Sequence, residues 1–456
     1  MNEHIPQEIL NIYNKVKEAK FEIYLVGGCV RNLLLRRPVK DWDMTTNATP
    51  EEILKAFKKG FYDNRFGTVG IPFHTTEYEG VVEITTFRTE RGFSDKRRPD
   101  IVEWGKSIEE DLARRDFTIN AIALKLTMSD KRQATSIIDP YQGQKDLESK
   151  IIRAVGDPKK RFKEDALRLL RAVRIATELS FKIEENTWKE IESDSFLIKE
   201  VSGERIRVEL LRILSSDRSY EGIMMLKDSS LLNYIIPEIM EGIGISQKRP
   251  GRHHTEDVFT HNVLSLKFCP STDPIVRFAA LLHDVGKPKV MSKDDKGLVI
   301  FYNHEVSGAN IARDICGRLK FSKKEKDKVV NLIRWHMFTV DEKVSDAGIR
   351  RFIRRIGVES VKDMMDLRIG DRLGGGTQTA ESWRLKFFKK RIEDQLKPLP
   401  FSINDLAIDG NDIMKELNIK PGPKIGEYIQ KLFEEVDEDL AKNNREYLLK
   451  RVKDLA

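Results

Sequence analysis

The chain has 456 residues, which is enough for about three domains and for a sizeable hydrophobic core. Charged residues make up 34% of it and hydrophobic residues 40%, a balance typical of a protein that folds in water. The formal net charge of +7 is a modest positive excess, and it favours a polyanionic partner.

The three cysteines, Cys29, Cys269 and Cys316, lie far apart and form no CxxC pair. Neither a disulfide framework nor a thiolate zinc site is therefore expected. No segment approaches the roughly 18 apolar residues that cross a membrane, and the start, MNEHIPQEIL, has no long apolar core. We expect a cytoplasmic protein without membrane contact and without an obligatory protein partner.

Short β-rich runs alternate with helical stretches over the first 150 residues. The runs are FEIYLVGG, GTVGIPF, VVEITTFR and INAIALKL. Such a mixture predicts an α/β head built on a small mixed sheet.

From about residue 150 onward the pattern turns helical. RFKEDALRLLRAVRIATELSF and SGERIRVELLRILSS place apolar residues three and four apart, and similar stretches continue to the end. We expect an elongated, all-α body after the head. Gly- and Pro-containing breaks at 243–255 and 373–379 are candidate boundaries. The expected parts are 1–150, 151–245, 246–375 and 376–456.

The stretch GGCVRNLLLRRPVKDWDM, residues 27–44, begins as a glycine turn between a predicted strand and a short helix. Gly27 and Gly28 let the backbone approach a ligand closely, and the free N–H groups at a helix start favour a phosphate. Arg31 lies in the first helical turn and can add a fork of donors to the same phosphates.

The end of this stretch, KDWDM, predicts a strand that carries Asp41 and Asp43 on one face and Trp42 on the other. Paired carboxylates suit divalent cations, and a two-metal site clamps the attacking and leaving oxygens of a phosphoryl displacement. The expected reaction is nucleotidyl transfer with Mg²⁺. Glu83, in VVEITTFR, is a candidate third carboxylate, and an exposed strand glutamate is the other interpretation.

The motif LVGGCVRNLLLRRPVKDWD resembles the nucleotidyltransferase superfamily, in particular bacterial-type (class II) tRNA CCA-adding enzymes and bacterial poly(A) polymerases. Asn32 replaces the usual aspartate and Arg36 the usual glycine. The resemblance continues in order through TFRTERGFSDKRRPD, EEDLARRDFTINAIA, DPYQGQKDLESKIIRAVGDPKKRF, EDALRLLRAVR and ERIRVELLRIL. It covers roughly residues 20–215.

This resemblance implies nucleotide contacts beyond the opening motif. In RRDFTIN it assigns Arg114, Arg115 and Asn120 to the nucleotide or its triphosphate. In EDALRLLRAVR it places Arg171 and Arg174 near the nucleotide or tRNA.

Asp165 and Arg168 are expected on neighbouring faces of one helix, able to meet one flat ligand together. A carboxylate accepts from an exocyclic amine, and a guanidinium donates to a ring nitrogen. Cytosine and adenine present both groups side by side, whereas uracil and guanine leave buried polar groups unpaired. The pair therefore predicts selection of CTP and ATP, as the resemblance also implies.

The resulting hypothesis is CCA addition to tRNA, with Asp41 and Asp43 binding the Mg²⁺ that activates the tRNA 3′-hydroxyl against the α-phosphate. In the family, the loop that here reads RGFSDKRRPD is associated with addition of the terminal A, and it is intact. Complete CCA addition is therefore favoured. Poly(A) synthesis, CC-only addition and A-only addition share these motifs and stay open.

Six of the eight histidines fall between positions 253 and 336: His253, His254, His261, His283, His304 and His336. Their segments HTEDVFTHNVLSL, FAALLHDVGKP, FYNHEVSGANIA and LIRWHM, with LRIGDRLG, resemble in this order the HD phosphohydrolase superfamily. The resemblance implies an HD-type helical domain in the body. His254 also matches that family's surroundings, whereas His253 is expected at the surface.

By this resemblance, the ligands of a first metal ion would be His261, His283, Asp284 and Asp371. His304 and His336 would be available for a second metal ion. Imidazole and carboxylate together suit Mn, Ni, Co, Fe or Zn rather than calcium, so the metal stays open. The family implies phosphatase or 2′,3′-cyclic phosphodiesterase activity. Beyond this region, helices joined by the turn in KPGPKIG are expected, with tRNA contact or plain helix connection as alternative roles.

Overall fold

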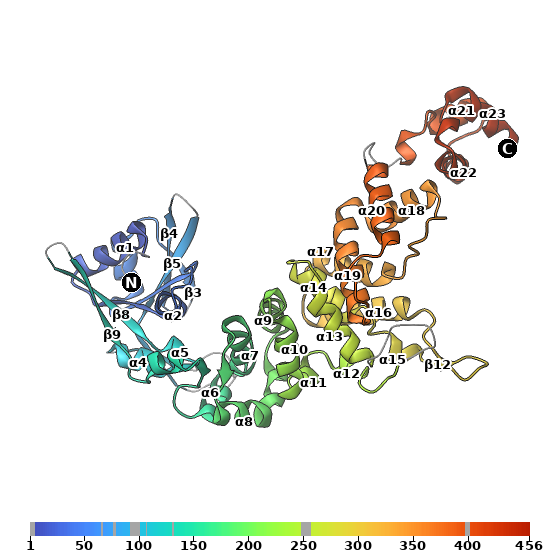
Figure 1. Cartoon of the computed structure of the whole chain (residues 1–456). Coiled ribbons are helices and arrows are strands. Elements are labelled where there is room, and N and C mark those ends of the chain that lie inside the picture. The colour runs from blue at the N-terminus through green and yellow to red at the C-terminus, as the bar shows by residue number, and fades with distance from the viewer. Residues whose placement is uncertain are drawn as a thin grey trace. The chain divides into compact units, whose positions relative to one another are not determined.

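The computed structural model forms two compact units, which are described separately (Figure 1). The first comprises Met1–Met240 with Arg318–Phe321, and the second comprises Glu241–Gly317 with Ser322–Ala456. The residues described are 5–64, 67–75, 79–91, 101–105, 107–129, 132–247, 257–396 and 402–456.

A seven-stranded sheet, with strand order β3-β4-β5-β2-β1-β8-β9, forms the centre of the head. β2 and β5 run parallel and the other neighbours antiparallel, so the predicted mixed sheet is confirmed. Its strands are β1 Ile23–Val26, β2 Trp42–Thr46, β3 Phe61–Asn64, β4 Thr68–His74, β5 Glu79–Thr86, β8 Ala123–Ser129 and β9 Arg132–Ile138. β6 (Arg88–Arg91) and β7 (Ile101–Trp104) form a separate hairpin.

Helix α1 (Gln7–Glu18) is fastened to the sheet by one buried tyrosine. The Tyr13 hydroxyl donates to the Ile23 carbonyl at 2.7 Å and accepts from the Leu126 N–H at 2.9 Å. Burial raises the pKa of Tyr13 to about 12, so the hydroxyl keeps its proton and its donor role at neutral pH. A single side chain thereby links α1 to β1 and β8.

The two departures from the family motif have structural explanations at helix α2 (Gly28–Leu34). Arg36 has φ 54°, the left-handed conformation that commonly follows a helix, where glycine is preferred. Its N–H donates to the Leu33 carbonyl at 3.1 Å, which terminates the helix. The Asn32 side-chain oxygen accepts from Nε and Nη2 of Arg31, both at 3.3 Å, and so offers an aspartate's acceptor without its charge.

We expect Arg36→Gly to raise the free energy of unfolding by about 1 kcal/mol, because glycine adopts a positive φ without the Cβ penalty. Urea unfolding of the full chain measures the difference. Lys17→Gly, in the exposed face of α1, is the matched control and should instead lower stability by about 1 kcal/mol. Destabilisation by both substitutions would contradict this interpretation of Arg36.

Short helices complete the first unit. Those around the sheet are α3 Pro50–Ala56, α4 Ile108–Ala113 and α5 Gly143–Glu148. Those after the sheet are α6 Pro158–Glu164, α7 Leu167–Leu179, α8 Glu185–Asp194, α9 Gly203–Ser215, α10 Ser219–Asp228, α11 Leu232–Ile235 and α12 Pro237–Met240. The strands β10 (Ile151–Ile152) and β11 (Lys182–Ile183) form a small parallel pair.

The expectation of one continuous helix through EDALRLLRAVR was wrong. Asp165 has extended backbone, with φ −147° and ψ 105°, and separates α6 from α7. Its carboxylate accepts from the Leu167 N–H at 3.1 Å, satisfying a donor at the start of the second helix. Hydrophobic spacing continues across this junction, so periodicity alone did not reveal it.

The second unit is helical apart from one small hairpin, β12 (Ser292–Lys293) with β13 (Val299–Ile300), among the described residues. Its helices are α13 Val258–Phe268, α14 Pro274–Leu282, α15 Lys287–Val290, α16 His304–Arg318, α17 Lys323–Trp335, α18 Asp346–Ile356, α19 Val361–Gly374, α20 Trp383–Leu396, α21 Gly410–Leu417, α22 Pro423–Glu438 and α23 Arg445–Leu455. The predicted helical body is confirmed.

Two glycines bring α13 and α19 close together. A Cβ at Gly370 would lie 3.2 Å from the Cys269 Cα, and one at Gly374 3.0 Å from the Ser265 Cα. These helices carry His261 and Asp371 respectively.

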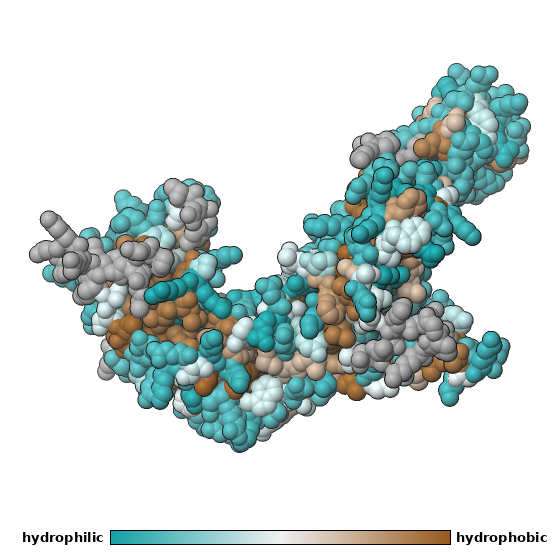
Figure 2. All heavy atoms as spheres, viewed as in Figure 1, coloured by the Kyte–Doolittle hydropathy of each residue, from teal (hydrophilic) through white to brown (hydrophobic). Residues whose placement is uncertain are grey.

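Hydrophilic side chains cover most of the visible face, including α21–α23 (Figure 2). The C-terminal helices enclose a separate hydrophobic cluster that contains Ile413, Leu432, Val436, Leu448 and Val452. No described helix is both long and apolar enough to span a membrane.

Candidate active sites

The three candidate carboxylates gather at the start of β2. Asp43 and Glu83 are register partners on the parallel strands β2 and β5, so their side chains share one face of the sheet. The strand begins at Trp42, so Asp41 stands just before it rather than within it, contrary to the expected strand. Burial raises the pKa of Asp43; the Arg115 guanidinium opposes this shift and the Asp41 carboxylate adds to it.

The glycine turn lies against this acidic group. Gly27 has φ 73°, and a Cβ there would lie 2.9 Å from Nη1 of Arg115 and 3.5 Å from Oδ2 of Asp43. A side chain at position 27 would therefore occupy the space over the turn, next to the Arg115 guanidinium and the Asp43 carboxylate. Gly28 begins α2, and its Cβ would stand 3.6 Å from Nη2 of Arg31.

Asp111 was missed from the sequence, although it positions two of the predicted arginines. Its buried carboxylate pairs with Arg114 and, at 3.0 Å, with Arg115. Burial alone would raise the pKa of Asp111, but the two guanidinium groups outweigh it and hold the pKa below its ordinary value. The spacing of three and four residues from Asp111, across the end of α4, was the available signal.

Asp116 was also missed, and it joins three candidate residues. Its carboxylate accepts from Nη2 of Arg171 at 2.6 Å and from the Asn120 amide at 3.0 Å. The oxygen of that amide accepts from Nη1 of Arg31 at 2.7 Å. Arg174 pairs with the buried Glu209 and, at 2.7 Å, with Glu178. Arg31, Asn120 and Arg171 are thus fixed in one network.

Asp165 and Arg168 each have a protein partner in the structure. Both carboxylate oxygens of Asp165 meet Arg205, at 3.1 and 2.7 Å, in a two-pronged pair that the sequence did not indicate. Arg168 donates to Glu164 at 2.8 Å and to the Arg114 carbonyl at 2.9 Å. The helical spacing argument does not hold because Asp165 precedes α7, but both side chains remain at one helix start.

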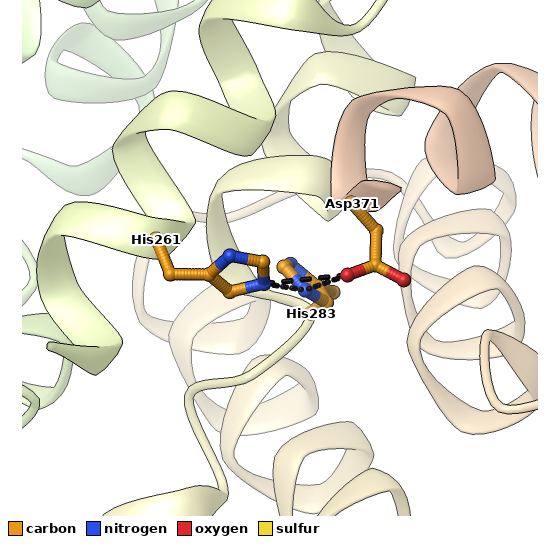
Figure 3. A group of neighbouring side chains, drawn as sticks. All are labelled: His261, His283 and Asp371. Atoms are coloured by element: carbon orange, nitrogen blue, oxygen red, sulfur yellow. Dashed lines mark hydrogen bonds and ion pairs between the residues drawn. The ribbon is translucent and has the colours of Figure 1, made fainter. Parts of the chain in front are cut away.

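In the second unit, His261, His283 and Asp371 converge from α13, the end of α14 and α19 (Figure 3). The two histidine Nε2 atoms lie 3.1 Å apart, and Oδ1 of Asp371 lies 3.3 and 3.6 Å from them. Oδ2 of Asp284 is 3.3 Å from His261 Nε2 and 3.4 Å from His283 Nε2. These four residues form the first donor set.

The spacing in the first donor set fits one divalent ion. Two ligand atoms that each lie about 2.1 Å from one ion are about 3.0 Å apart when their bonds to the ion meet at a right angle. In a tetrahedral arrangement they are about 3.4 Å apart. Four of the observed separations, 3.1 to 3.4 Å, lie within this range, and the fifth, between His283 and Asp371, is slightly longer at 3.6 Å. Burial alone would lower the pKa of His283. The Asp284 and Asp371 carboxylates outweigh burial and raise that pKa to about 10, which shows that they favour positive charge at this place.

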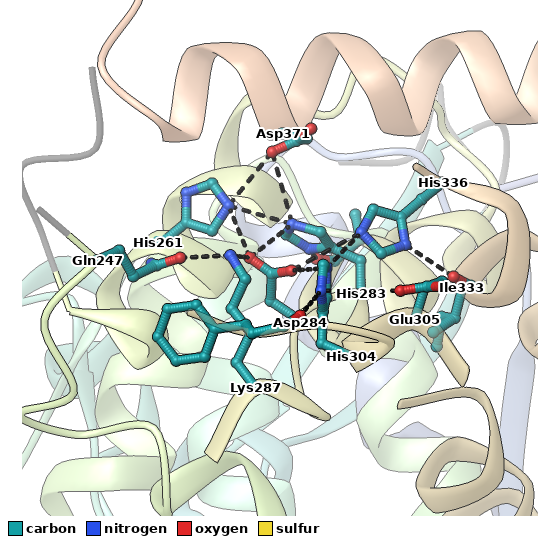
Figure 4. A network of polar contacts seen from close by, with 12 residues as sticks. Gln247, His261, His283, Asp284, Lys287, His304, Glu305, Ile333, His336 and Asp371 are labelled. Carbon is teal, nitrogen blue, oxygen red and sulfur yellow. Dashed lines mark hydrogen bonds and ion pairs between the residues drawn. The ribbon is translucent and has the colours of Figure 1, made fainter. Parts of the chain in front are cut away.

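A second donor set, His304, His336 and the other oxygen of Asp284, adjoins the first (Figure 4). Oδ1 of Asp284 lies 3.2 Å from His304 Nε2 and 3.7 Å from His336 Nε2, and the two nitrogens are 3.3 Å apart. Asp284 therefore faces both sets, one oxygen to each. Burial lowers the pKa of His336 to about 3, which keeps its imidazole neutral, as a metal ligand requires.

Three of these histidines share one orienting contact. The Nδ1 atoms of His283, His304 and His336 meet the backbone carbonyls of Ala280, Phe301 and Ile333 at 2.9, 2.8 and 2.7 Å. A carbonyl accepts, so each Nδ1 carries a proton and each Nε2 faces the centre, where the neutral imidazole can offer its lone pair to a metal ion. Backbone carbonyls orient metal-binding histidines in this way in known sites.

Gly286 and Lys287, in HDVGK, support this cluster and were not singled out from the sequence. A Cβ at Gly286 would overlap the backbone of His304 and Gly308, so glycine allows α16 to approach Asp284. The buried Lys287 ammonium donates to Asp284 and Gln247. His253, His254 and the loop RGFSDKRRPD lie outside the described residues, apart from the backbone of Arg91.

We expect Gly286→Ala to lower the free energy of unfolding by about 1–3 kcal/mol, because the added methyl meets backbone that cannot move aside. Gly426→Ala in α22, where nothing lies within 4 Å of the added Cβ, should be neutral or gain up to about 1 kcal/mol. Urea unfolding of both variants checks the contrast. Equal effects would show that Gly286 is not sterically required.

The head and its carboxylate site define a nucleotidyltransferase. Residues 23–153 match the family model described as "Poly A polymerase head domain", and 180–243 match "Probable RNA and SrmB- binding site of polymerase A". Residues 292–452 match a model of tRNA nucleotidyltransferase domain 2.

Curated relatives give the family more specifically. The CCA-adding enzyme of Ligilactobacillus salivarius (strain UCC118) is 32% identical over 99% of this chain and 98% of its own length. That of Pediococcus pentosaceus is 32% identical over 99% of both. The chain belongs to the CCA-adding enzyme family of tRNA nucleotidyltransferases.

Solved structures support the fold. The Bacillus stearothermophilus CCA-adding enzyme in complex with CTP superposes with TM-score 0.73 at 24% identity, over 98% of this chain and 97% of that one. The Thermotoga maritima CCA-adding enzyme complexed with tRNA_CCA has TM-score 0.58 at 21% identity, over 99% and 97%.

Proposed function

We propose that the head completes the CCA sequence at the tRNA 3′ end from CTP and ATP. The observation that carries this proposal is the meeting of Asp41, Asp43 and Glu83 beside the Gly27 turn, with Arg115 over the same turn. Similarity to enzymes solved with CTP and with tRNA_CCA supports the choice of substrates.

Mg²⁺ is the proposed ion for Asp41 and Asp43, because carboxylate oxygens are the ligands that this hard cation prefers. Bound there, it would supply charge compensation for the triphosphate and activate the tRNA 3′-hydroxyl. Arg31, Arg114 and Arg115 would hold the triphosphate, and their positions are set by Asn120 and Asp111.

Base selection is assigned to Asp165 and Arg168. A carboxylate has about four acceptor sites, so Asp165 can keep Arg205 and still accept from an exocyclic amine. Arg168, held by Glu164, would donate to the adjacent ring nitrogen. Arg171 and Arg174 lie further along the same helix, each paired with a carboxylate, and would border the nucleotide or tRNA.

Incubating tRNA that lacks CCA with one nucleoside triphosphate at a time tests this selection. We expect CTP to be incorporated and UTP and GTP to be used at least about 10²-fold less efficiently, because they leave buried polar groups unpaired. Comparable use of UTP would contradict the assignment of Asp165 and Arg168.

For the second unit we propose metal-dependent hydrolysis of phosphate esters, with 2′,3′-cyclic phosphate ends as substrates. The donor spacing and the shared orientation of three imidazoles support a site for one or two ions of Mn, Ni, Co, Fe or Zn. Such an activity would restore a usable 3′ end on damaged tRNA before nucleotide addition.

We infer a head at 1–150, a nucleotide-recognition and RNA-binding region at 151–245, an HD-type domain at 246–375 and a helical tail at 376–456, for which tRNA contact and plain helix connection are the alternative roles. Cytoplasmic location would follow from work on tRNA.

A further inference from the structure

A cavity of about 400 Å³ lies beside the second donor set, within the same unit. It is formed by the end of α17, the loop that follows it, α18 and α20. Its volume lies in the range of pockets that bind small molecules.

Aromatic rings form one part of this pocket. The ring centroids of Phe338 and Phe352 lie 4.8 Å apart, and that of Phe388 lies 5.7 and 5.5 Å from them. Met337, 59% exposed, adds an apolar side chain to the lining. An apolar, ring-lined surface of this kind suits a flat aromatic ligand.

Guanidinium groups form another part. Arg334 and Arg355 lie over the Trp335 ring, at 4.2 and 4.4 Å from its centroid. Within the described residues Arg355 has no carboxylate within ion-pairing distance, and Arg334 is 3.7 Å from Glu305. Arg334 and Arg355 carry two positive charges on the pocket lining and Glu305 one negative charge, and this excess of guanidinium groups favours an anionic ligand.

The pocket is lined by chain neighbours of two candidate metal ligands, His304 and His336. Glu305 lines it and follows His304, whose Nδ1 is 3.8 Å from the Glu305 carboxylate (Figure 4). Trp335 and Met337 flank His336 in the chain. The pocket therefore lies on the Nδ1 side of His304, and a phosphate held by the arginines would stand behind this imidazole, on the side away from the Nε2 atom that faces the second donor set.

We propose that this pocket binds one nucleotide unit of an RNA 3′ end, with its base against Phe338 and Phe352 and its phosphate at Arg334 and Arg355. The proposal deepens the hydrolytic function proposed above and rests on it for the fate of the phosphate. Binding itself needs only the pocket.

Calorimetric titration of the EDTA-treated full chain with 2′,3′-cyclic CMP separates the two claims. Arg355→Gln should weaken binding by about tenfold or more, because an ionised hydrogen-bond partner is lost. Thr339→Glu, an exposed residue of the pocket, should weaken it through charge repulsion. Arg384→Gln, from an exposed Arg–Trp pair outside the pocket, is the matched control and should stay within about twofold of the unaltered chain. Inorganic phosphate should bind more weakly than the nucleotide.

If Arg355→Gln and Thr339→Glu bind 2′,3′-cyclic CMP as tightly as the unaltered chain does, the proposed nucleotide-binding role of the pocket is wrong. Absence of cyclic nucleotide binding to the unaltered chain would do the same. Weakened binding by these variants, with no hydrolysis under any divalent ion, would support the pocket and contradict only the hydrolytic function.

Discussion

Asp43→Asn is expected to reduce nucleotide transfer to tRNA by about 10³-fold or more, with little change in folding. The substitution keeps the size of the side chain but replaces one acceptor oxygen by a donor and removes a charge that lies beside Asp41 and opposite Glu83. A loss of this size corresponds to about 4 kcal/mol of transition-state stabilisation, which is within the contribution of a metal-binding or charge-stabilising group.

Initial rates with CTP and a tRNA that lacks CCA measure this effect. Glu51→Gln, an exposed carboxylate in the first turn of α3, is the matched control and should retain full activity. Thermal unfolding of both variants shows whether the head is intact. Transfer by Asp43→Asn at more than about one tenth of the normal rate would contradict a metal-binding role for this carboxylate.

Asp284→Asn is expected to abolish stabilisation of the second unit by divalent transition metals. The unaltered chain should gain about 2.7 kcal/mol when the free metal is at 100 times its dissociation constant. Asp284 presents one oxygen to each donor set, so its loss weakens both sites. The buried Lys287 also loses its only charged partner among the described residues, although Gln247 remains, and the metal-free variant will therefore start from a lower stability.

The quantity to compare is thus the change in Tm on adding Mn²⁺, Ni²⁺, Co²⁺, Fe²⁺ or Zn²⁺ to EDTA-treated protein, not Tm itself. Asp295→Asn, an exposed carboxylate between β12 and β13, is the control and should respond as the unaltered chain does. CTP incorporation should persist in Asp284→Asn, because the transferase residues lie in the other unit. An unchanged metal-induced shift would exclude Asp284 as a ligand.

Local sequence patterns predicted the parts of the site that are close together in the chain. The order of glycines, Arg31, Asp41 and Asp43 within one stretch indicated a strand, a turn and a carboxylate group, and β1, α2 and β2 follow that order. The mixed sheet and the helical body followed from hydrophobic periods of two and about 3.6 residues.

Contacts between distant segments could not be predicted in this way. Arg205 is 40 positions from Asp165, and Asp116 is 55 from Arg171, so no spacing rule connects them. The break at Asp165 was missed because apolar spacing continues across two helices. The sequence around Gly286 gave no local signal that glycine is required there. The requirement arises because the backbone of α16 leaves no room for a Cβ.

Product sequences from tRNAs that end before, within and after CCA test the central claim most directly. With CTP and ATP together, we expect every substrate to finish at CCA and extension to stop there. Long adenosine tails on generic RNA would indicate a poly(A) polymerase, and products that stop at CC, or that gain only the final A, would indicate a partial activity. Any of these results would contradict complete CCA addition by this chain.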